Sequence, residues 1–180
     1  MKSAQRQKYL DYTESGIEWA GRIPAHWTVA IIRRYFRIEN GSTPASAEPA
    51  YWDGDITWVT PEDLGQLSSS YITETRRYLT DAGYRSCGTS MVPAGSLVIS
   101  TRAPIGHLVI AGVDLCTSQG CRSMVPKELQ DIRYFYYQLI IEKPFLEALG
   151  TGSTFRELSR NALAGSSIII PPLAEQRAIA

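Results

Sequence analysis

The stretch VPAGSLVISTRAPIGHLVIAG, residues 92–112, holds two short apolar runs with one polar connection between them. The runs LVIS and HLVIA have the length and the aliphatic content of short buried strands. Between them, Pro104 and Gly106 suit the backbone of a turn. The stretch therefore predicts two strands joined by a turn within a β-rich region.

The residues before this stretch predict one more strand and a long loop. ITWVT (56–60) alternates like a strand, and PEDL (61–64) can open a short helical turn with Pro61 in its first position. Residues 39–55 are rich in Gly, Ser, Thr and Pro, so we expect a long ordered loop there. VAIIRRYFRI (29–38) has an apolar pattern that fits a helix and a strand about equally.

The residues after the stretch predict two helices and two short strands. LQDIRYFYYQLIIEKPFLEALG (129–150) carries an apolar stripe at helical spacing. Pro144 inside it should kink or divide the helix, because proline lacks the amide donor and clashes with the preceding turn. TFRELSRNAL (154–163) predicts a short second helix, whereas SMVP (123–126) and SSIIIP (166–171) predict strands.

The final segment, IIIPPLAEQRAIA (168–180), passes from a strand into the start of a helix. Pro171 and Pro172 end the strand, and Glu175 in the first turn favours the positive end of the helix dipole. The remaining residues are fewer than the roughly 12–15 that an isolated helix needs to persist in water. We therefore expect this helix either to pack on the body of the domain or to continue beyond residue 180.

Length and composition limit the class of protein. The chain has 180 residues, 44% of them hydrophobic and 20% charged, which suits one globular domain. No apolar run approaches the roughly 18–20 residues of a membrane span, and the N-terminus lacks the apolar core of a secretory signal. The three cysteines form no CxxC motif, which favours free thiols in a cytoplasmic protein without a membrane partner.

The charge balance argues against a simple nucleic-acid binder. The formal net charge is zero, whereas non-specific DNA binding depends mostly on neutralising phosphates. Basic residues do gather locally, at Arg33, Arg34 and Arg37, at Arg76 and Arg77, and at Arg156 and Arg160. Each group alone is typical of a solvated surface, so a neutral DNA binder would need partner subunits to supply most phosphate contacts.

The sequence contains none of the common catalytic devices. His26 and His107 share no metal-ligand spacing with each other or with a cysteine, which indicates structural or surface histidines. GTGST (150–154) resembles a nucleotide-binding phosphate loop only weakly, because the GxxxxGK[ST] pattern is missing, and no serine lies in a GxSxG motif. We therefore predict no catalytic residue, no metal site and no cofactor.

Several polar loops lie beside the predicted strands and helices. They are GSTP (41–44), VTPED (59–63), STRAP (100–104), TSQG (117–120) and GSTFR (152–156). Arg and Gln can each make two hydrogen bonds to a base edge, carboxylates can accept from cytosine, and hydroxyl groups can contact phosphate oxygens. Each loop alone is also typical of an ordinary turn, so composition leaves their role open.

Taken in order, the motifs resemble a known family. The series consists of SGIEWAGRIPAHWTV (15–29), GSTP (41–44), YWDGDITWVTPEDL (51–64), PAGSLVISTRAPIG (93–106), TSQGC (117–121), GSTFRELS (152–159) and IIIPPLAEQRAIA (168–180). It is similar to the first target-recognition domain of the specificity subunit of type I restriction–modification systems. The similarity covers nearly the whole chain, and the leader, WVT, APIG and PPLAEQ in series are its most specific parts.

The resemblance implies an α+β fold with a curved mixed β-sheet and flanking helices, followed by the start of a long spacer helix of coiled-coil type. On this basis we expect a leader at 1–28 that packs on the domain, a target-recognition domain at 29–170, and the start of the spacer helix at 171–180. That helix should continue, so the chain should be about half of a full-length subunit.

The resemblance also implies a function without catalysis. In the family, a full-length subunit has two such domains, and each recognises one half of a split target in double-stranded DNA. The helices between and after them dock methyltransferase subunits and, through these, restriction subunits. We expect this chain to recognise one half-site, with weak self-association through its C-terminal helix.

The polar loops supply the candidate DNA contacts. We expect Arg102 and Gln119 to contact base edges, and Glu62 and Asp63 are included because a carboxylate can accept from cytosine. The candidates for phosphate are Thr43, Thr60, Thr101, Ser153 and Thr154, with Arg156 suited to either role. Family members often carry Asn-Gln-Gly where this chain has Ser118-Gln119-Gly120, which leaves the contact at residue 118 open.

Two alternatives stay open. The chain could be the recognition region of a fused restriction–methyltransferase enzyme, although Met1 followed by the complete leader argues against an upstream catalytic region. It could instead be a protein-interaction module that docks a methyltransferase without contacting bases. The interaction module differs from the first hypothesis because it makes no contribution to the choice of DNA sequence, whereas a catalytic region upstream in the same reading frame would favour the fused enzyme.

Overall fold

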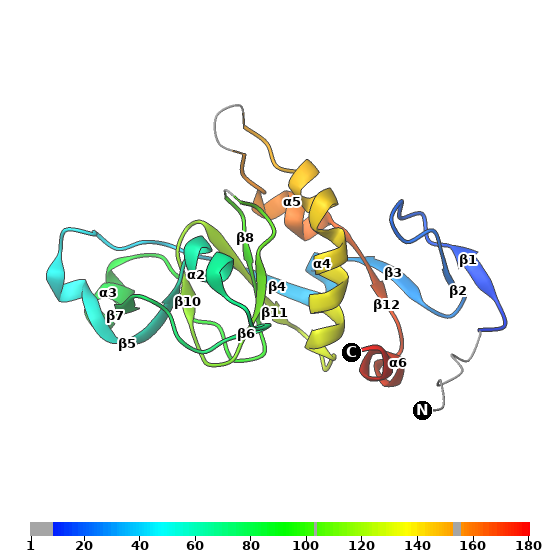
Figure 1. Cartoon of the computed structure of the whole chain (residues 1–180), viewed down its shortest axis with the longest axis horizontal. Coiled ribbons are helices and arrows are strands. Elements are labelled where there is room, and N and C mark those ends of the chain that lie inside the picture. The colour runs from blue at the N-terminus through cyan, green and yellow to red at the C-terminus, as the bar shows by residue number, and fades with distance from the viewer. Residues whose placement is uncertain (1–8, 103, 153–155) are drawn as a thin grey trace.

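A computed structural model of the chain describes residues 9–102, 104–152 and 156–180 (Figure 1). The elements follow one long axis. A small lobe around β5 (Trp52–Val59) lies at one end, and a five-stranded sheet beside the long helix α4 (Ile132–Ala148) lies in the middle. The other end holds the hairpin of β1 (Tyr12–Glu14) and β2 (Arg22–Pro24). The mixture of helices and open sheets confirms the predicted α+β class.

The central sheet is mixed, with strand order β4, β11, β8, β9, β6. Its strands are β4 (Phe36–Asn40), β11 (Cys121–Pro126), β8 (Leu97–Ser100), β9 (Leu108–Ala111) and β6 (Tyr71–Ile72). Neighbouring strands are antiparallel except β6, which runs parallel to β9. β8 and β9 are the two apolar runs of the opening stretch, and they pair directly, which confirms the predicted strand pair.

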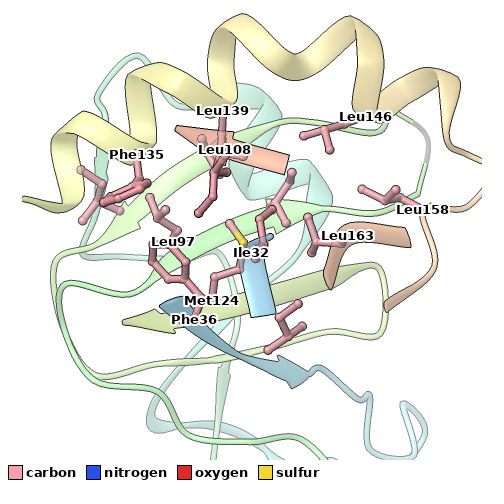
Figure 2. Packing of buried hydrophobic residues seen from close by; sticks show 14 of the residues in the cluster. Ile32, Phe36, Leu97, Leu108, Met124, Phe135, Leu139, Leu146, Leu158 and Leu163 are labelled. Carbon is pink, nitrogen blue, oxygen red and sulfur yellow. The ribbon is translucent and has the colours of Figure 1, made fainter. Parts of the chain in front are cut away.

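The sheet is buried on both faces because successive side chains of each strand enter different cores. Leu97 and Ile99 belong to the core under α4, whereas Val98 between them belongs to a second core that includes Leu64. Leu64 lies in α2 (Pro61–Gln66), the helical turn that PEDL predicted. Figure 2 shows Phe135 and other α4 side chains pointing into the first core. The central strands are thus packed against an apolar core on each face of the sheet.

α4 continues through Pro144, so of the two predicted effects, a kink or a division, the division does not occur. Pro144 cannot bond the carbonyl group of Ile140, one turn earlier. Both residues are exposed, so water can satisfy that carbonyl oxygen on the solvent side of the helix. The apolar contacts on the opposite side, including Leu139 and Leu146, keep the helix in place.

The second predicted helix begins later than expected. α5 (Arg160–Gly165) starts after Ser159, whose side chain accepts a hydrogen bond from the amide of Ala162. The residues just before it are extended, because Glu157 pairs with Thr151 and the amide of Leu158 bonds the carbonyl oxygen of Thr101. Tertiary pairing therefore overrides the helical pattern predicted for 154–163.

Residues 29–38 form both structures that their pattern allowed. β3 (Thr28–Ile31) and the single turn α1 (Ile32–Tyr35) precede β4, and β3 pairs with the buried strand β12 (Ser167–Ile170). The loop predicted for 39–55 is shorter than expected. After η1 (Pro49–Tyr51), strand β5 begins at Trp52, because it pairs across a bulge with β7 (Tyr78–Leu79).

Two short elements complete the small lobe, and the cysteines agree with the prediction of free thiols. β10 (Cys116–Thr117) runs parallel to β5, and α3 (Asp81–Ser86) packs beside η1. The three cysteines are free thiols. Burial raises the pKa of both Cys116 and Cys121 to about 12, so neither is a nucleophile near neutral pH.

The described part of the leader forms the hairpin of β1 and β2, and residues on either side of this hairpin contact α6 (Leu173–Ile179). The link is Glu175, whose carboxylate accepts from the Tyr9 hydroxyl at 2.7 Å and the Trp27 indole nitrogen at 2.8 Å and lies 2.7 Å from Nε2 of His26. These hydrogen bonds, with that of Tyr9 the strongest, lower the pKa of Glu175.

Within the ranges described above, none of the helices has the length and apolarity needed to cross a membrane.

Candidate nucleic-acid interface

The predicted polar loops meet around residues 117–120, although they are far apart in the sequence. The amide of Ser42 donates to the carbonyl oxygen of Thr117 at 2.9 Å, and the amide of Ser118 donates to that of Val59 at 2.8 Å. We call the set 41–44, 59–63, 101–102, 117–120 and 156–157 the loop surface. The fold therefore assembles one surface from segments that the sequence could only treat separately.

Gln119 and Thr43 are in direct contact on this surface. The Thr43 hydroxyl donates to the side-chain oxygen of Gln119, whose residue is exposed. The two loops approach so closely that a Cβ atom at Gly41 would overlap the carbonyl oxygen of Ser118. The bond to Thr43 uses only the side-chain oxygen of Gln119, and within the described ranges its side-chain nitrogen has no hydrogen-bond partner, so it can donate to a ligand. The glycine of GSTP thus permits the contact that holds Gln119.

Arg102 lies on the surface, whereas Thr101 lies beneath it. The Arg102 side chain is 48% exposed, and its Nη2 atom is 2.9 Å from a carboxylate oxygen of Glu157. Thr101 is fully buried, and its amide (2.7 Å) and hydroxyl group (3.2 Å) both donate to the carbonyl oxygen of Gly120. Thr101 therefore holds the loop that carries Arg102 against Gly120. It has no exposed atom that could contact DNA.

Thr60 and Asp63 also support the loops from within. Each caps the other at the start of α2, where the Thr60 side chain accepts from the amide of Asp63 and the Asp63 side chain accepts from the amide of Thr60. Glu62 is exposed, and its two carboxylate oxygens contact the two terminal nitrogens of Arg76, each at 2.5 Å. That hydrogen bonding lowers the pKa of Glu62, so its carboxylate is ionised and paired.

An open cavity of about 610 Å³ adjoins the loop surface beside α2. Glu62, Gln66, Arg76, Arg77 and His107 are among its lining residues. The sequence pattern indicated only that Arg76 and Arg77 were adjacent basic residues. In the structure the two arginines have different partners. Arg76 binds Glu62, whereas the Arg77 guanidinium stacks on the ring of Trp52 at 3.3 Å.

Arg156 turns back toward α4. Its guanidinium donates to the carbonyl oxygens of Ala148 at 3.2 Å and Gly150 at 3.1 Å, which places a cation at the C-terminal end of the helix. Ser153 and Thr154, the other candidates in this loop, lie outside the described residues.

Sequence reasoning missed two residues that connect the loop surface, Arg122 and Glu157. The Arg122 guanidinium donates to the carbonyl oxygen of Gln119 at 3.1 Å and lies 3.7 Å from Glu157. Burial lowers the pKa of Arg122, while Glu157 acts in the opposite direction. An arginine inside the strand β11 and a glutamate in a loop carry no local signal of such a role.

The chemistry of this surface is that of hydrogen bonding. It presents guanidinium, amide, hydroxyl and carboxylate groups, which are the groups that pair with base edges and phosphates. Among the residues that the structure describes, no group of three or more His, Cys, Asp or Glu side chains could hold a metal ion.

Comparison with known proteins gives one consistent family. Residues 24–180 match the family described as the type I restriction modification DNA specificity domain. The type I restriction enzyme MjaIX specificity subunit of Methanocaldococcus jannaschii is 35% identical over 162 residues, which cover 89% of this chain and 38% of the relative. The EcoR124I/EcoR124II specificity subunit of Escherichia coli is 23% identical over 181 residues, covering 97% of this chain and 42% of the relative.

Solved structures agree on the fold. The HsdS subunit from Thermoanaerobacter tengcongensis superposes with a TM-score of 0.69 at 21% identity, covering 93% of this chain and 38% of that one. A chain from a study of complex assembly and conformational transition in the type I R-M system gives a TM-score of 0.71 at 23% identity, covering 93% and 39%. This chain thus spans about two-fifths of the length of these relatives.

Proposed function

Because the chain belongs to the type I restriction modification DNA specificity domain family, we propose that it recognises one half of a split target in double-stranded DNA. It acts as part of a specificity subunit and has no catalysis of its own. The observation that carries this proposal is the meeting of the loops around Gln119, with Arg102 and the Gln119 amide exposed on one surface. Guanidinium and carboxamide groups are the side chains that distinguish guanine and adenine in the major groove.

Within this proposal the first group of candidate residues acts at the bases, and the second group comprises the supporting residues and the loop proposed for phosphate contact. Arg102 and Gln119 contact base edges, Thr43 orients Gln119, and Glu62 lies at the rim, where it is held by Arg76. The residues that keep this surface in shape are Thr60, Asp63 and Thr101, while Ser153, Thr154 and Arg156 belong to the loop proposed for phosphate contact. Loss of a residue in the first group should change base preference, and loss of one in the second should weaken binding to all sequences.

Partner subunits are part of the proposal. A chain with zero formal net charge neutralises few phosphates by itself, so most of the non-specific affinity must come from elsewhere. We propose that methyltransferase subunits, and restriction subunits bound through them, supply it in the cytoplasm. The proposed parts are a leader at 1–28, the recognition domain at 29–170 and the start of a spacer helix at 171–180, which would also permit weak self-association.

A second candidate function is docking of a methyltransferase without base contact. It is favoured by an open, largely apolar cavity of about 520 Å³ between the leader, α4 and α6, whose lining includes Tyr12, Trp19, Tyr137 and Ile141. The two functions differ in one outcome, because docking alone leaves the DNA sequence preference unchanged.

Exchange of residues 30–165 for those of another family member distinguishes the two functions. The specificity subunit carrying either version is expressed with its methyltransferase, and modified bases are mapped across the genome. Recognition predicts that one half of the modified motif changes with the exchange, whereas docking predicts the same motif from both versions.

Single substitutions test the surface itself in the same assembled complex. Arg102→Ala should weaken binding to the mapped target by about 10- to 100-fold, since a good base contact is worth roughly 1–3 kcal/mol. Arg85→Ala is the matched control, because Arg85 is an exposed arginine of α3. Equal affinity of the Arg102 and Arg85 variants for the target would refute the assignment of Arg102.

A further inference from the structure

One carboxylate connects the side chain of Arg102 with the backbone of Gln119, and these are the two residues proposed to contact bases. The Oε2 atom of Glu157 is 2.9 Å from Nη2 of Arg102, and its Oε1 atom is 3.7 Å from Nη2 of Arg122. Nη1 of Arg122 donates to the carbonyl oxygen of Gln119 at 3.1 Å. Glu157 therefore contacts Arg102 directly and reaches Gln119 through Arg122.

The backbone of Glu157 is held by hydrogen bonds, which fix the position from which its carboxylate reaches Arg102 and Arg122. Its amide donates to the carbonyl oxygen of Thr151 at 2.8 Å, and its own carbonyl oxygen accepts from the Thr151 amide at 3.0 Å. An isolated bridge also joins Glu157 to Arg102. Both sides of the ion pair thus belong to paired backbone segments, although Arg102 and Glu157 are far apart in the sequence.

Arg122 is unusual for an arginine, because its side chain is only 14% exposed. Removing a guanidinium from water is unfavourable unless the charge is compensated. Glu157 compensates it in part, and the carbonyl oxygens of Gln119 and Cys121 accept from its Nη1 atom. The Nε atom of Arg122 has no partner among the described residues. A largely buried cation with one carboxylate partner among the described residues is therefore sensitive to the loss of that partner.

Arg102 keeps donors for a ligand while it is held. Its contact with Glu157 involves Nη2, and a guanidinium has five N–H donors on three nitrogens. A guanine edge requires two of them in one plane. An arginine that is fixed on one side by a carboxylate presents its remaining donors in one orientation, whereas a free arginine must be ordered by the DNA itself.

We propose that Glu157 is a positioning residue for base recognition, which orients Arg102 directly and the loop of Gln119 through Arg122. The inference rests on the proposed function and deepens it. Loss of the Glu157 charge should therefore reduce the preference for the target over altered sequences. A carboxylate that merely repelled DNA would act differently, because its removal would strengthen binding to all sequences equally.

The test compares dissociation constants in the assembled methyltransferase complex at one salt concentration. The DNA probes are a duplex with the target obtained by mapping modified bases and duplexes with one altered base pair in the half-site. For Glu157→Gln we expect the ratio between altered and target duplexes to fall at least tenfold, with a smaller fall for Glu157→Asp. Glu147→Gln is the control, because Glu147 is exposed on α4 and faces Lys143 at 3.9 Å.

A second variant separates positioning from general damage to the fold. Arg122→Met removes the link to Gln119 and leaves the Arg102–Glu157 pair in place, so it should lower discrimination at some base pairs of the half-site and keep it at others. Glu157→Gln should lower discrimination at both sets. A Glu157→Gln complex with the ratios of the wild type, within twofold, would overturn the inference and leave the proposed function intact. A wild-type complex without any sequence preference would overturn both.

Discussion

Replacement of Glu142 by glutamine should stabilise the protein at neutral and alkaline pH. Glu142 lies in α4 with only 2% of its surface exposed, and its carboxylate accepts a hydrogen bond from Nε2 of Gln138 at 2.8 Å. No cation is paired with it in the part of the chain that the structure describes. Burial raises the pKa of Glu142 from the ordinary 4.5 to about 7, although the hydrogen bond from Gln138 favours the charged form.

The sign and size of the effect follow from these two values. The unfolded chain releases this proton near pH 4.5, whereas the folded protein keeps it until about pH 7. Between these values the folded state binds more protons, so a rise in pH lowers the free energy of unfolding. At about 1.4 kcal/mol per pH unit, the loss reaches ~3 kcal/mol at pH 8 and ~1 kcal/mol at pH 5. Glutamine has the same shape, can accept the same hydrogen bond and carries no charge, so it avoids this loss.

Urea unfolding of the wild type and of Glu142→Gln at pH 5 and pH 8 measures the difference. The expected gain in the free energy of unfolding is ~3 kcal/mol at pH 8 and ~1 kcal/mol at pH 5. The control is Glu147→Gln in the same helix, where the exposed pair with Lys143 should contribute less than ~0.5 kcal/mol at either pH. A gain that is the same at both pH values, or a destabilised variant at pH 8, would refute the reasoning.

Three further predictions concern the loops and the leader. Gly41→Ala should lower the free energy of unfolding by ~1–3 kcal/mol, because the new Cβ atom would overlap the carbonyl oxygen of Ser118; an unchanged urea midpoint would contradict it. Thr60→Ala should cost about 1 kcal/mol by removing the N-cap of α2, and Thr60→Ser, which keeps a capping hydroxyl group, should be nearly neutral in the same assay. The hydrogen bond to Glu175 raises the pKa of Tyr9 to about 12, so Glu175→Gln should return it toward the ordinary 10.0. Tyrosinate absorbance measured against a Tyr9→Phe reference checks this, and a pKa that stays at about 12 in the variant would contradict it.

Local sequence patterns were sufficient where neighbouring residues determine the structure. The paired strands of 92–112, the helical turn opened by Pro61 and the buried strand before Pro171 follow from apolar runs and proline positions, and all three are present. The same patterns were insufficient at Pro144, because burial of one face of α4 outweighs the lost hydrogen bond on its exposed face.

Local sequence patterns also could not predict how the polar loops are placed relative to one another. Sequence reasoning selected the polar loops one by one, and only the folded chain brings them together around Gln119. Thr101 was selected for its hydroxyl group, yet the fold buries it beneath the loop. Burial depends on what the rest of the chain places above a residue, so no pattern within STRAP could indicate it.

By itself, the sequence determined the family, the α+β class and the main strands and helices, because these depend on short-range periodicity, turn residues and the order of motifs along the chain. Only the tertiary structure decided which polar residues share a surface and which residues hold them. Arg102 meets Glu157, and Arg122 meets Gln119 and Glu157, through contacts that depend on the pairing of strands and loops. Such contacts arise when the apolar cores close around the sheet, and that closure brings distant charges within ion-pair distance.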